Sequence, residues 1–399
     1  MNRRTLVFLA VVVVLAAVAA AFLAIPRAPA EPIKIGLLTP LSPPGDPAAG
    51  TRIKRGAEVA VEIFNEAGGV LGRKIELIVE DDAGTPEKGA AGARKLITAD
   101  KVVIIGGQYH SSVALQVQDI CEQYSVICFF PHPSATKITE KGLKWTFRVH
   151  VLDLDRADIL VRWAKQAGYK RVAAVAENTD FGLGYIENLK TKMKEKGMQA
   201  EFFSIVFDRT TKDLTPELLK VKEFNPDLIV NIGVGTPTFL MTTQAYDLGL
   251  IPKAKMVAAF DWPTRPEYWD NVGEKGVGMA WVGTFHPKIK LTQMGQKFLE
   301  RYKAKYGEDP IYPDFQGFGH IYVMVQAIQK AGSDNPEAIR NALLNNEFDY
   351  WVGKVKFSQT PGVGWQHVTV PSIHIAEWNA VRQKLADAPI IYPPELATK

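Results

Sequence analysis

A regular alternation of two kinds of segment limits the possible folds more than any other feature of this sequence. From Pro32 onward, short apolar runs such as residues 102–105 and 228–232 alternate with amphipathic segments of about ten to sixteen residues. The short runs predict β-strands, and the longer segments predict α-helices with one apolar face. The chain is therefore expected to form βαβ units around parallel sheets.

Two series of these units follow each other, as 399 residues allow at about 150 residues per domain. The same plan of apolar strand, Gly-rich loop, helix and apolar strand occurs at residues 102–130 and again at 228–259. The expected strands are residues 33–38, 75–79, 102–105, 127–130, 171–176, 201–206, 228–232 and 256–259. We predict an α/β fold with two similar lobes, each an open three-layer sandwich, in which a ligand binds at the carboxyl ends of the strands.

The N-terminus predicts export. Arg3 and Arg4 precede an unbroken apolar run over residues 6–25, and the tripeptide Ala-Pro-Ala ends at Ala30. This order is typical of a secretory signal peptide, with Glu31 as the first residue after cleavage. Because the run also reaches the ~20 residues that span a bilayer, residues 1–30 are either a signal peptide or an N-terminal anchor. Under both readings the rest of the chain lies outside the cytoplasmic membrane, in the periplasm or at the extracellular face.

Charge and motifs exclude several functions. The net charge of +4 comes from 47 basic and 43 acidic residues that are spread along the chain, so a nucleic-acid partner is not expected. Signatures of serine hydrolases, zinc proteases and P-loop proteins are missing, which argues against an enzyme. His110, His132 and His150 match no local metal-ligand spacing, and we expect neither a metal nor a cofactor.

The chain has two cysteines, Cys121 and Cys128. The first lies near the end of a predicted helix and the second opens a predicted strand. Outside the membrane they can form a disulfide if their Cα atoms come within about 7 Å of each other. The sequence leaves this pairing open.

Candidate binding residues follow the end of a buried strand in the first lobe. A Gly-Gly pair at residues 106–107 leads through Tyr109 and His110 to Ser111, where a helix is expected to begin. Glycines let the backbone approach a ligand, and free N–H groups at a helix N-terminus attract an anion such as a carboxylate. A plain helix cap by Ser111 or Ser112 is the alternative.

Other strand ends are expected at the same crevice. Ser134 and Thr136 follow the next strand, and neighbouring parallel strands end at one edge of a sheet. From the second lobe, Asp261 follows an equivalent strand and can pair with a ligand ammonium group. Trp262 or Phe181 can cover the apolar part of the ligand.

A set of short segments also carries the pattern of one known family. These segments are residues 33–36 (IKIG), 56–60, 63–77 (IFNEAGGVLGRKIEL), 80–82 (EDD), 105–106, 133–136 (PSAT), 181–182 and 226–227. The sequence resembles the leucine/isoleucine/valine-binding family, the type I extracytoplasmic solute-binding proteins of ABC transporters. The resemblance covers nearly all of the chain after residue 30.

The resemblance implies the type I periplasmic-binding-protein fold, in which two Rossmann-like lobes are joined by a three-segment hinge. The three crossings are expected near residues 147–153, 278–285 and 350–357. They divide the chain into a first lobe of residues 31–149 plus about 284–350 and a second lobe of about 150–283 plus 351–399.

The resemblance also implies a mechanism and a role for each candidate residue. Family members close their lobes on a small ligand as monomers, and the closed form docks on the permease subunits of an ABC transporter in the membrane. The implied contacts to the ligand's α-carboxylate and α-amine are made by Tyr109, His110, Ser111, Ser134 and Thr136. Phe181 is implied to cover the ligand, Asp261 to pair with the amine, and Asp153 to act as a hinge aspartate.

Some positions depart from the family pattern. His110 stands where serine is usual, and Ala49 stands where an aromatic side chain is expected. The family also has an aromatic residue in the second lobe, and the matching position in this chain falls near Val234 or Gly235. The predicted ligand is a branched-chain or other apolar amino acid, and a receptor for an amide, urea or an aromatic carboxylate on the same scaffold stays open.

Two other classes of protein also stay open. One is an exported enzyme that uses His110 or His132 with Asp261. The other is the ligand-sensing ectodomain of a signalling receptor, which normally needs a second membrane segment. No apolar run after Ile25 reaches eighteen residues, which disfavours the receptor.

Overall fold

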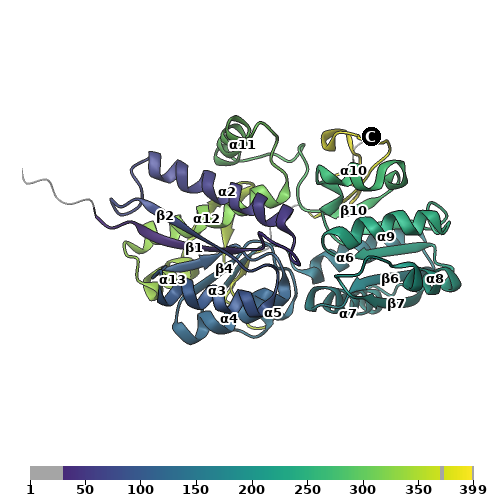
Figure 1. The fold of residues 1–399 in the computed structure, drawn as a ribbon, viewed down its shortest axis with the longest axis horizontal. Coiled ribbons are helices and arrows are strands. Elements are labelled where there is room, and N and C mark those ends of the chain that lie inside the picture. The colour runs from purple at the N-terminus through teal and green to yellow at the C-terminus, as the bar shows by residue number, and fades with distance from the viewer. Residues whose placement is uncertain (1–29, 369–372, 398–399) are drawn as a thin grey trace, which may run out of the picture.

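The structure is a computed structural model that describes residues 30–368 and 373–397 (Figure 1). The predicted signal peptide or anchor, except Ala30, lies outside the described residues. Within them, the strands form a six-stranded sheet, a seven-stranded sheet and a two-stranded hairpin. Figure 1 shows two groups of elements side by side along the longest axis, which we call the first and the second lobe in chain order.

The first lobe contains the six-stranded sheet, with the strand order β13-β5-β4-β3-β1-β2 and only parallel pairs. Its strands are β1 (Ile33–Thr39), β2 (Ile75–Asp81), β3 (Ile104–Gly106), β4 (Ile127–Phe130), β5 (Thr146–Val149) and β13 (His367–Val368). Its helices are α2 (Pro47–Glu66), α3 (Pro86–Thr98), α4 (Ser111–Tyr124), α5 (Lys137–Glu140), α11 (Gln293–Tyr306), α12 (Tyr312–Ala331) and α13 (Pro336–Asn345). Every residue of β3, β4 and β5 is buried, as expected for parallel strands covered on both faces.

The second lobe contains the seven-stranded sheet, with the order β15-β14-β10-β9-β8-β6-β7. Its strands are β6 (Arg171–Glu177), β7 (Glu201–Phe207), β8 (Leu228–Ile232), β9 (Lys255–Ala258), β10 (Ala280–Gly283), β14 (His374–Glu377) and β15 (Ile390–Tyr392). Its helices are α6 (Asp153–Ala167), α7 (Asp180–Glu195), α8 (Thr215–Phe224), α9 (Thr236–Asp247) and α10 (Glu267–Val272), with short 3₁₀ turns η1 (Trp262–Thr264), η2 (Gly273–Gly276) and η3 (Leu385–Asp387). The strands β14 and β15 pair antiparallel, unlike the others.

Local signals set the helix ends. Helix α3 begins after Thr85, whose side chain accepts a hydrogen bond from the backbone N–H of Lys88, and Pro86 is its first residue. Helix α6 ends at Gly168, which has a φ of 84°. This left-handed conformation favours glycine and closes the helix.

The chain crosses between the lobes at residues 150–152, between β5 and α6, and again at residues 284–292, between β10 and α11. After the second crossing, α11 and α12 return to pack against α2. These two crossings lie at or just beyond the segments that the family resemblance implies.

The third crossing lies further along the chain than residues 350–357. Strands β11 (Glu347–Tyr350) and β12 (Gly353–Lys356) form a hairpin, and Gln326 of α12 donates a hydrogen bond to the carbonyl of Asp349 at 2.9 Å. Phe357 then packs against Phe129 and Phe147 in the first sheet. Because β13 pairs with β5, the chain leaves the first lobe only after Val368, and β14 is the next strand.

Both cysteines are buried as free thiols. Cys121 lies in α4 and Cys128 in β4. Burial and a hydrogen bond with Cys128 raise the pKa of the Cys121 thiol well above its ordinary value. The two sulfur atoms are therefore neighbours in this structure without being bonded.

Candidate ligand-binding site

A cavity lies between the lobes at the carboxyl ends of their parallel strands. It is narrow in this structure, with about 20 Å³ open to the centre of a water-sized sphere, and it continues into a wider mouth at Arg209 and Glu177. The residues that line it are Tyr109, His110, Ser111, Ser112, His132, Ser134, Arg156, Glu177, Thr179, Phe181, Arg209, Val234 and Phe260. This position is the one expected for a ligand site in open α/β sheets.

The first-lobe wall is built on the start of α4. His110 is the residue that precedes the helix, and its side chain makes no capping hydrogen bond. Ser111 accepts a hydrogen bond from the backbone N–H of Ala135 at 3.3 Å. Ser112 accepts one from the backbone N–H of Asp180 in the second lobe, also at 3.3 Å. The predicted residues Tyr109, His110 and Ser111 therefore line the cavity. The two serine hydroxyls bind the backbone of neighbouring segments instead of capping the helix.

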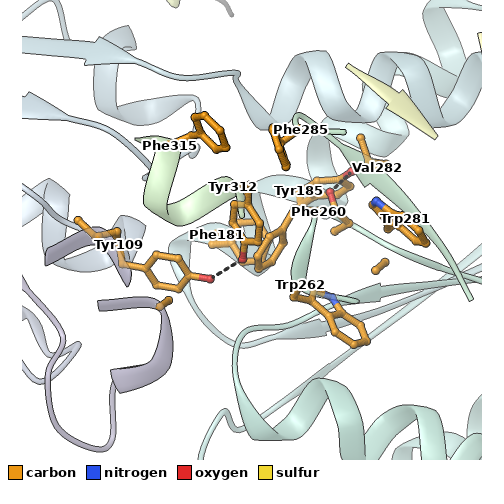
Figure 2. Close-up of a cluster of buried hydrophobic side chains, with 14 of the residues drawn as sticks. Tyr109, Phe181, Tyr185, Phe260, Trp262, Trp281, Val282, Phe285, Tyr312 and Phe315 are labelled. Atoms are coloured by element: carbon orange, nitrogen blue, oxygen red, sulfur yellow. Dashed lines mark hydrogen bonds between the residues drawn. The ribbon is translucent and has the colours of Figure 1, made fainter. Parts of the chain in front are cut away.

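Tyr109 forms part of an aromatic wall. Its ring lies against the His132 ring, with 4.1 Å between the ring centroids, and its hydroxyl is 3.4 Å from that of Tyr312. Figure 2 shows Tyr109 pointing towards Phe181 and Tyr312, with Phe260 beside them. Phe181 and Phe260 meet edge to face at 5.7 Å between centroids. These rings give the cavity an apolar side that suits a hydrocarbon group.

Arg156 of α6 lies at the cavity with a fully buried side chain. Its Nη1 donates to the Ser134 hydroxyl at 3.0 Å, and Asp153 Oδ1 lies 3.4 Å from the same nitrogen. Its Nη2 is 2.9 Å from His150 Nε2. Arg156 was not among the residues predicted from the sequence, because no motif marks it.

Glu177 supplies a carboxyl group to the cavity. It is the last residue of β6, and its oxygens accept hydrogen bonds from the Thr179 hydroxyl at 2.7 Å and from the backbone N–H of Val234 at 2.9 Å. Burial raises the pKa of Glu177 to about 7. The strand predicted from the sequence ends one residue earlier, at Ala176, so Glu177 is not among the predicted site residues.

Asp261 lies elsewhere than the prediction placed it. It is fully buried, and its two oxygens accept hydrogen bonds from the backbone N–H of Thr284 at 2.7 Å and from the Thr284 hydroxyl at 2.6 Å. It does not line the cavity, whereas the preceding residue, Phe260, does. Asp261 therefore holds the second crossing against the end of β9, and burial raises its pKa to about 6.

Trp262 and Thr136 are also outside the lining. Trp262 packs with Phe239 and Tyr268 inside the second lobe, and Figure 2 shows it pointing away from Tyr109. Thr136 accepts a hydrogen bond from the side-chain amide of Asn188 in α7 at 3.1 Å. It joins the two lobes beside the cavity.

One buried ion pair also joins the lobes. Arg265, which follows η1 in the second lobe, lies 2.6 Å from Asp46, the residue before α2 in the first lobe. Arg265 also donates hydrogen bonds to the hydroxyl groups of Tyr109 and Tyr312. The lobes are therefore in direct polar contact along one side of the cavity.

Two further properties concern metals and membranes. Among residues 30–368 and 373–397, no group of three or more His, Cys, Asp or Glu side chains is placed to hold a metal ion. Burial lowers the pKa of His110 to about 3 and the pKa of His132 and His150 well below the ordinary value. Within residues 30–368 and 373–397, no helix has the length and apolar character needed to span a bilayer.

A family model described as periplasmic binding protein matches residues 32–382. The chain belongs to this family. The Leu/Ile/Val-binding protein homolog 3 of Brucella melitensis is 26% identical over 357 residues, which cover 87% of this chain and 91% of that protein. The Leu/Ile/Val-binding protein BraC3 of Rhizobium johnstonii is 27% identical and covers 87% of this chain and 92% of its own length.

The crystal structure of a leucine binding protein LivK from Thermotoga maritima aligns with a TM-score of 0.79 and 26% identity, covering 91% of this chain and 99% of that chain. These findings confirm the predicted two-lobed fold and the family resemblance. Members of the family are solute-binding receptors that work outside the cytoplasmic membrane.

Proposed function

We propose that this chain is the extracytoplasmic solute receptor of an ABC importer and that it binds a branched-chain or other apolar amino acid by closure of its lobes. The observation that carries the proposal is the cavity between the lobes, whose lining combines aromatic rings with hydroxyl groups and charged groups. A pocket of this kind fits a ligand with one hydrocarbon group and one polar end. The names of the relatives point to the same class of ligand.

The lining suggests how an amino acid sits. Tyr109, Phe181 and Phe260 face the hydrocarbon side chain, and the polar groups at the start of α4 face the carboxylate. We assign the pairing with the ammonium group to Glu177 instead of Asp261, because Glu177 lines the cavity and Asp261 does not. Contacts from both lobes stabilise the closed form, which then docks on the permease. We expect the protein to act as a monomer and to release its ligand unchanged.

An aromatic carboxylate is the second candidate. The cavity walls carry several aromatic rings, and the raised pKa of Glu177 makes its neutral form accessible near pH 7. A ligand without an amine therefore leaves no unpaired buried charge at this position.

Calorimetric titration with leucine, isoleucine, valine, benzoate, acetamide and urea tests the proposal, supported by thermal melts. A ligand at 100 times its Kd stabilises the folded protein by about 2.7 kcal/mol, which is visible in a melt. We expect at least one of the three amino acids to bind and to be recovered unchanged. Binding of benzoate alone would favour the second candidate, and binding of acetamide or urea alone would contradict both.

A pair of variants tests the role of Glu177. Because Glu177→Gln removes the charge that faces the ammonium group, leucine affinity should fall at least about tenfold. Glu187→Gln is the matched control, since Glu187 lies on the outer face of α7 and its side chain is 69% exposed. Equal losses in both variants would place the ammonium group elsewhere.

A further inference from the structure

We propose that Arg156 anchors the ligand's carboxylate in the cavity, so that the protein selects carboxylic acids against their amides. This inference rests on the proposed function and adds the residue that decides the class of ligand. None of the sequence patterns assigns a role to Arg156. It is argued from the hydrogen bonds, the burial and the charges around its guanidinium group.

The guanidinium group has N–H donors to spare, because its five N–H groups exceed its three polar contacts. Its two terminal nitrogens are engaged by Ser134, Asp153 and His150. Its Nε is buried and has no hydrogen-bond partner in this structure. A buried charged donor without a partner is costly, so a ligand oxygen that accepts from this N–H recovers free energy that a neutral contact does not.

The groups around Arg156 hold it in place without neutralising it fully. The distance to Asp153 is 3.4 Å and joins one oxygen to one nitrogen, unlike the paired, shorter contacts of a bidentate ion pair. His150 is uncharged because burial lowers its pKa. Asp261 also acts on Arg156 through its charge, without a hydrogen bond to it. The guanidinium group is therefore fixed in orientation, and its Nε–H stays free for a further acceptor.

The charged residues that line the cavity also favour a negatively charged ligand group. Among the lining residues, Arg156 and Arg209 carry guanidinium groups and Glu177 carries a carboxyl group. Burial raises the pKa of Glu177 to about 7, so it offsets only part of the positive charge near neutral pH. A carboxylate is favoured in such a cavity over a neutral amide or urea.

Arg156 also connects the two lobes. It begins the second lobe, as a residue of the first turn of α6, and its Nη1 reaches Ser134 of the first lobe. A carboxylate bound at Arg156 therefore lies where residues of both lobes meet. Its contacts are complete only in the closed form, which links recognition of the acid to closure.

The test compares each acid with its own amide. Titration calorimetry measures the Kd of leucine and leucinamide, and of benzoate and benzamide, for the wild type and for Arg156→Met. We expect the wild type to prefer the acid by at least about tenfold and Arg156→Met to lose most of that preference. Arg162→Met is the matched control, because Arg162 lies on the same helix, pairs with Asp158 at 2.9 Å and is 46% exposed.

A second variant keeps the test decisive if Arg156→Met does not fold, as judged by circular dichroism. Arg156→Lys retains the charge but lacks the Nε–H and the planar fork, so the Kd for the acid should rise at least about tenfold. Unchanged acid-to-amide ratios in the folded Arg156 variants would overturn the inference while leaving the proposed function intact. A wild type that binds neither acid would overturn the proposed function and the inference together.

Discussion

Glu177 is a buried carboxyl group whose ionisation affects the stability of the folded protein. Its side chain accepts hydrogen bonds from Thr179 and Val234, and the charges of Arg209 and Asp46 act on it. Desolvation outweighs these contributions and raises its pKa from 4.5 to about 7. The folded protein therefore holds this proton more tightly than the unfolded chain does.

The sign of the pH dependence follows from this difference. Below pH 4.5 the group is protonated in both states and contributes its full stability. As the pH rises towards 7, the unfolded chain ionises first, and the folded state loses about 3 kcal/mol relative to it. Glu177→Gln has no carboxyl group to ionise at this position. Between pH 4.5 and pH 8, the free energy of unfolding of the variant should therefore rise by about 3 kcal/mol relative to that of the wild type.

Urea denaturation of both proteins at the two pH values measures this gain. Asp82 and Asp261 also have pKa values raised by burial, but they are present in both proteins and cancel in the difference. A constant difference between variant and wild type across this range would contradict the assignment of the raised pKa to Glu177.

The sequence located the candidate site to within a few residues and no better. Tyr109 and Phe181, which follow or begin recognisable elements, line the cavity. Asp261 was chosen over Phe260, yet both lie in the bend after β9, where Phe260 lines the cavity and Asp261 is held by Thr284. Arg156 could not be found from a motif, because its role depends on a crossing between lobes that the local pattern does not show.

At the scale of elements, α2 and α12 pack closely because glycines face each other's backbone. A Cβ atom on Gly56 would lie 2.1 Å from the carbonyl oxygen of Asp314, and one on Gly317 would lie 2.2 Å from that of Ile53. Arg52 adds a buried ion pair to Asp314 at 2.8 Å across the same contact. The helices have no room for a methyl group at either glycine.

Gly56→Ala should therefore destabilise the protein. The added methyl group meets backbone atoms that move only if the helix moves, which costs about 1 to 3 kcal/mol. Gly184→Ala in α7 is the control, because a Cβ there meets nothing within 4 Å and alanine favours the helix by about 0.4 to 1 kcal/mol. Thermal melts should show a lower transition for the first variant and an equal or higher one for the second. A Gly56→Ala variant that melts at the wild-type temperature would contradict the close packing.

The strands were the most predictable elements, and the last crossing was the least. Fully buried strands such as β4 read as continuous apolar runs, which the sequence displays directly. The third crossing was expected from the family resemblance near residues 350–357. Its true place follows from Phe357 packing in the first lobe and from the pairing of β13 with β5, both of which join residues far apart in the sequence.

At the scale of the whole molecule, Asp46 and Arg265 connect the lobes. Both side chains are almost completely buried, and the 2.6 Å contact joins the N-terminal end of α2 to the segment after η1. Tyr109 and Tyr312 accept further hydrogen bonds from the same guanidinium group. Since opening of the lobes would separate Asp46 from Arg265, this pair contributes to the free energy difference between the closed and open forms.

Asp46→Asn should shift that balance towards the open form. Asparagine can still accept the hydrogen bond from the backbone N–H of Ala49 that starts α2, so the helix keeps its cap. The charge that pairs with buried Arg265 is lost, however, and a buried ion pair left without one partner is strongly destabilised. We expect a larger radius of gyration in solution scattering and a ligand Kd raised about tenfold, because binding must also recover the cost of closure.

Asp270→Asn is the control, since its ion pair with Arg382 is exposed and lies within the second lobe. If Asp46→Asn matched the wild type in both scattering and Kd, the pair would have no part in closure, and the hinge segments together with the ligand would have to set the balance alone.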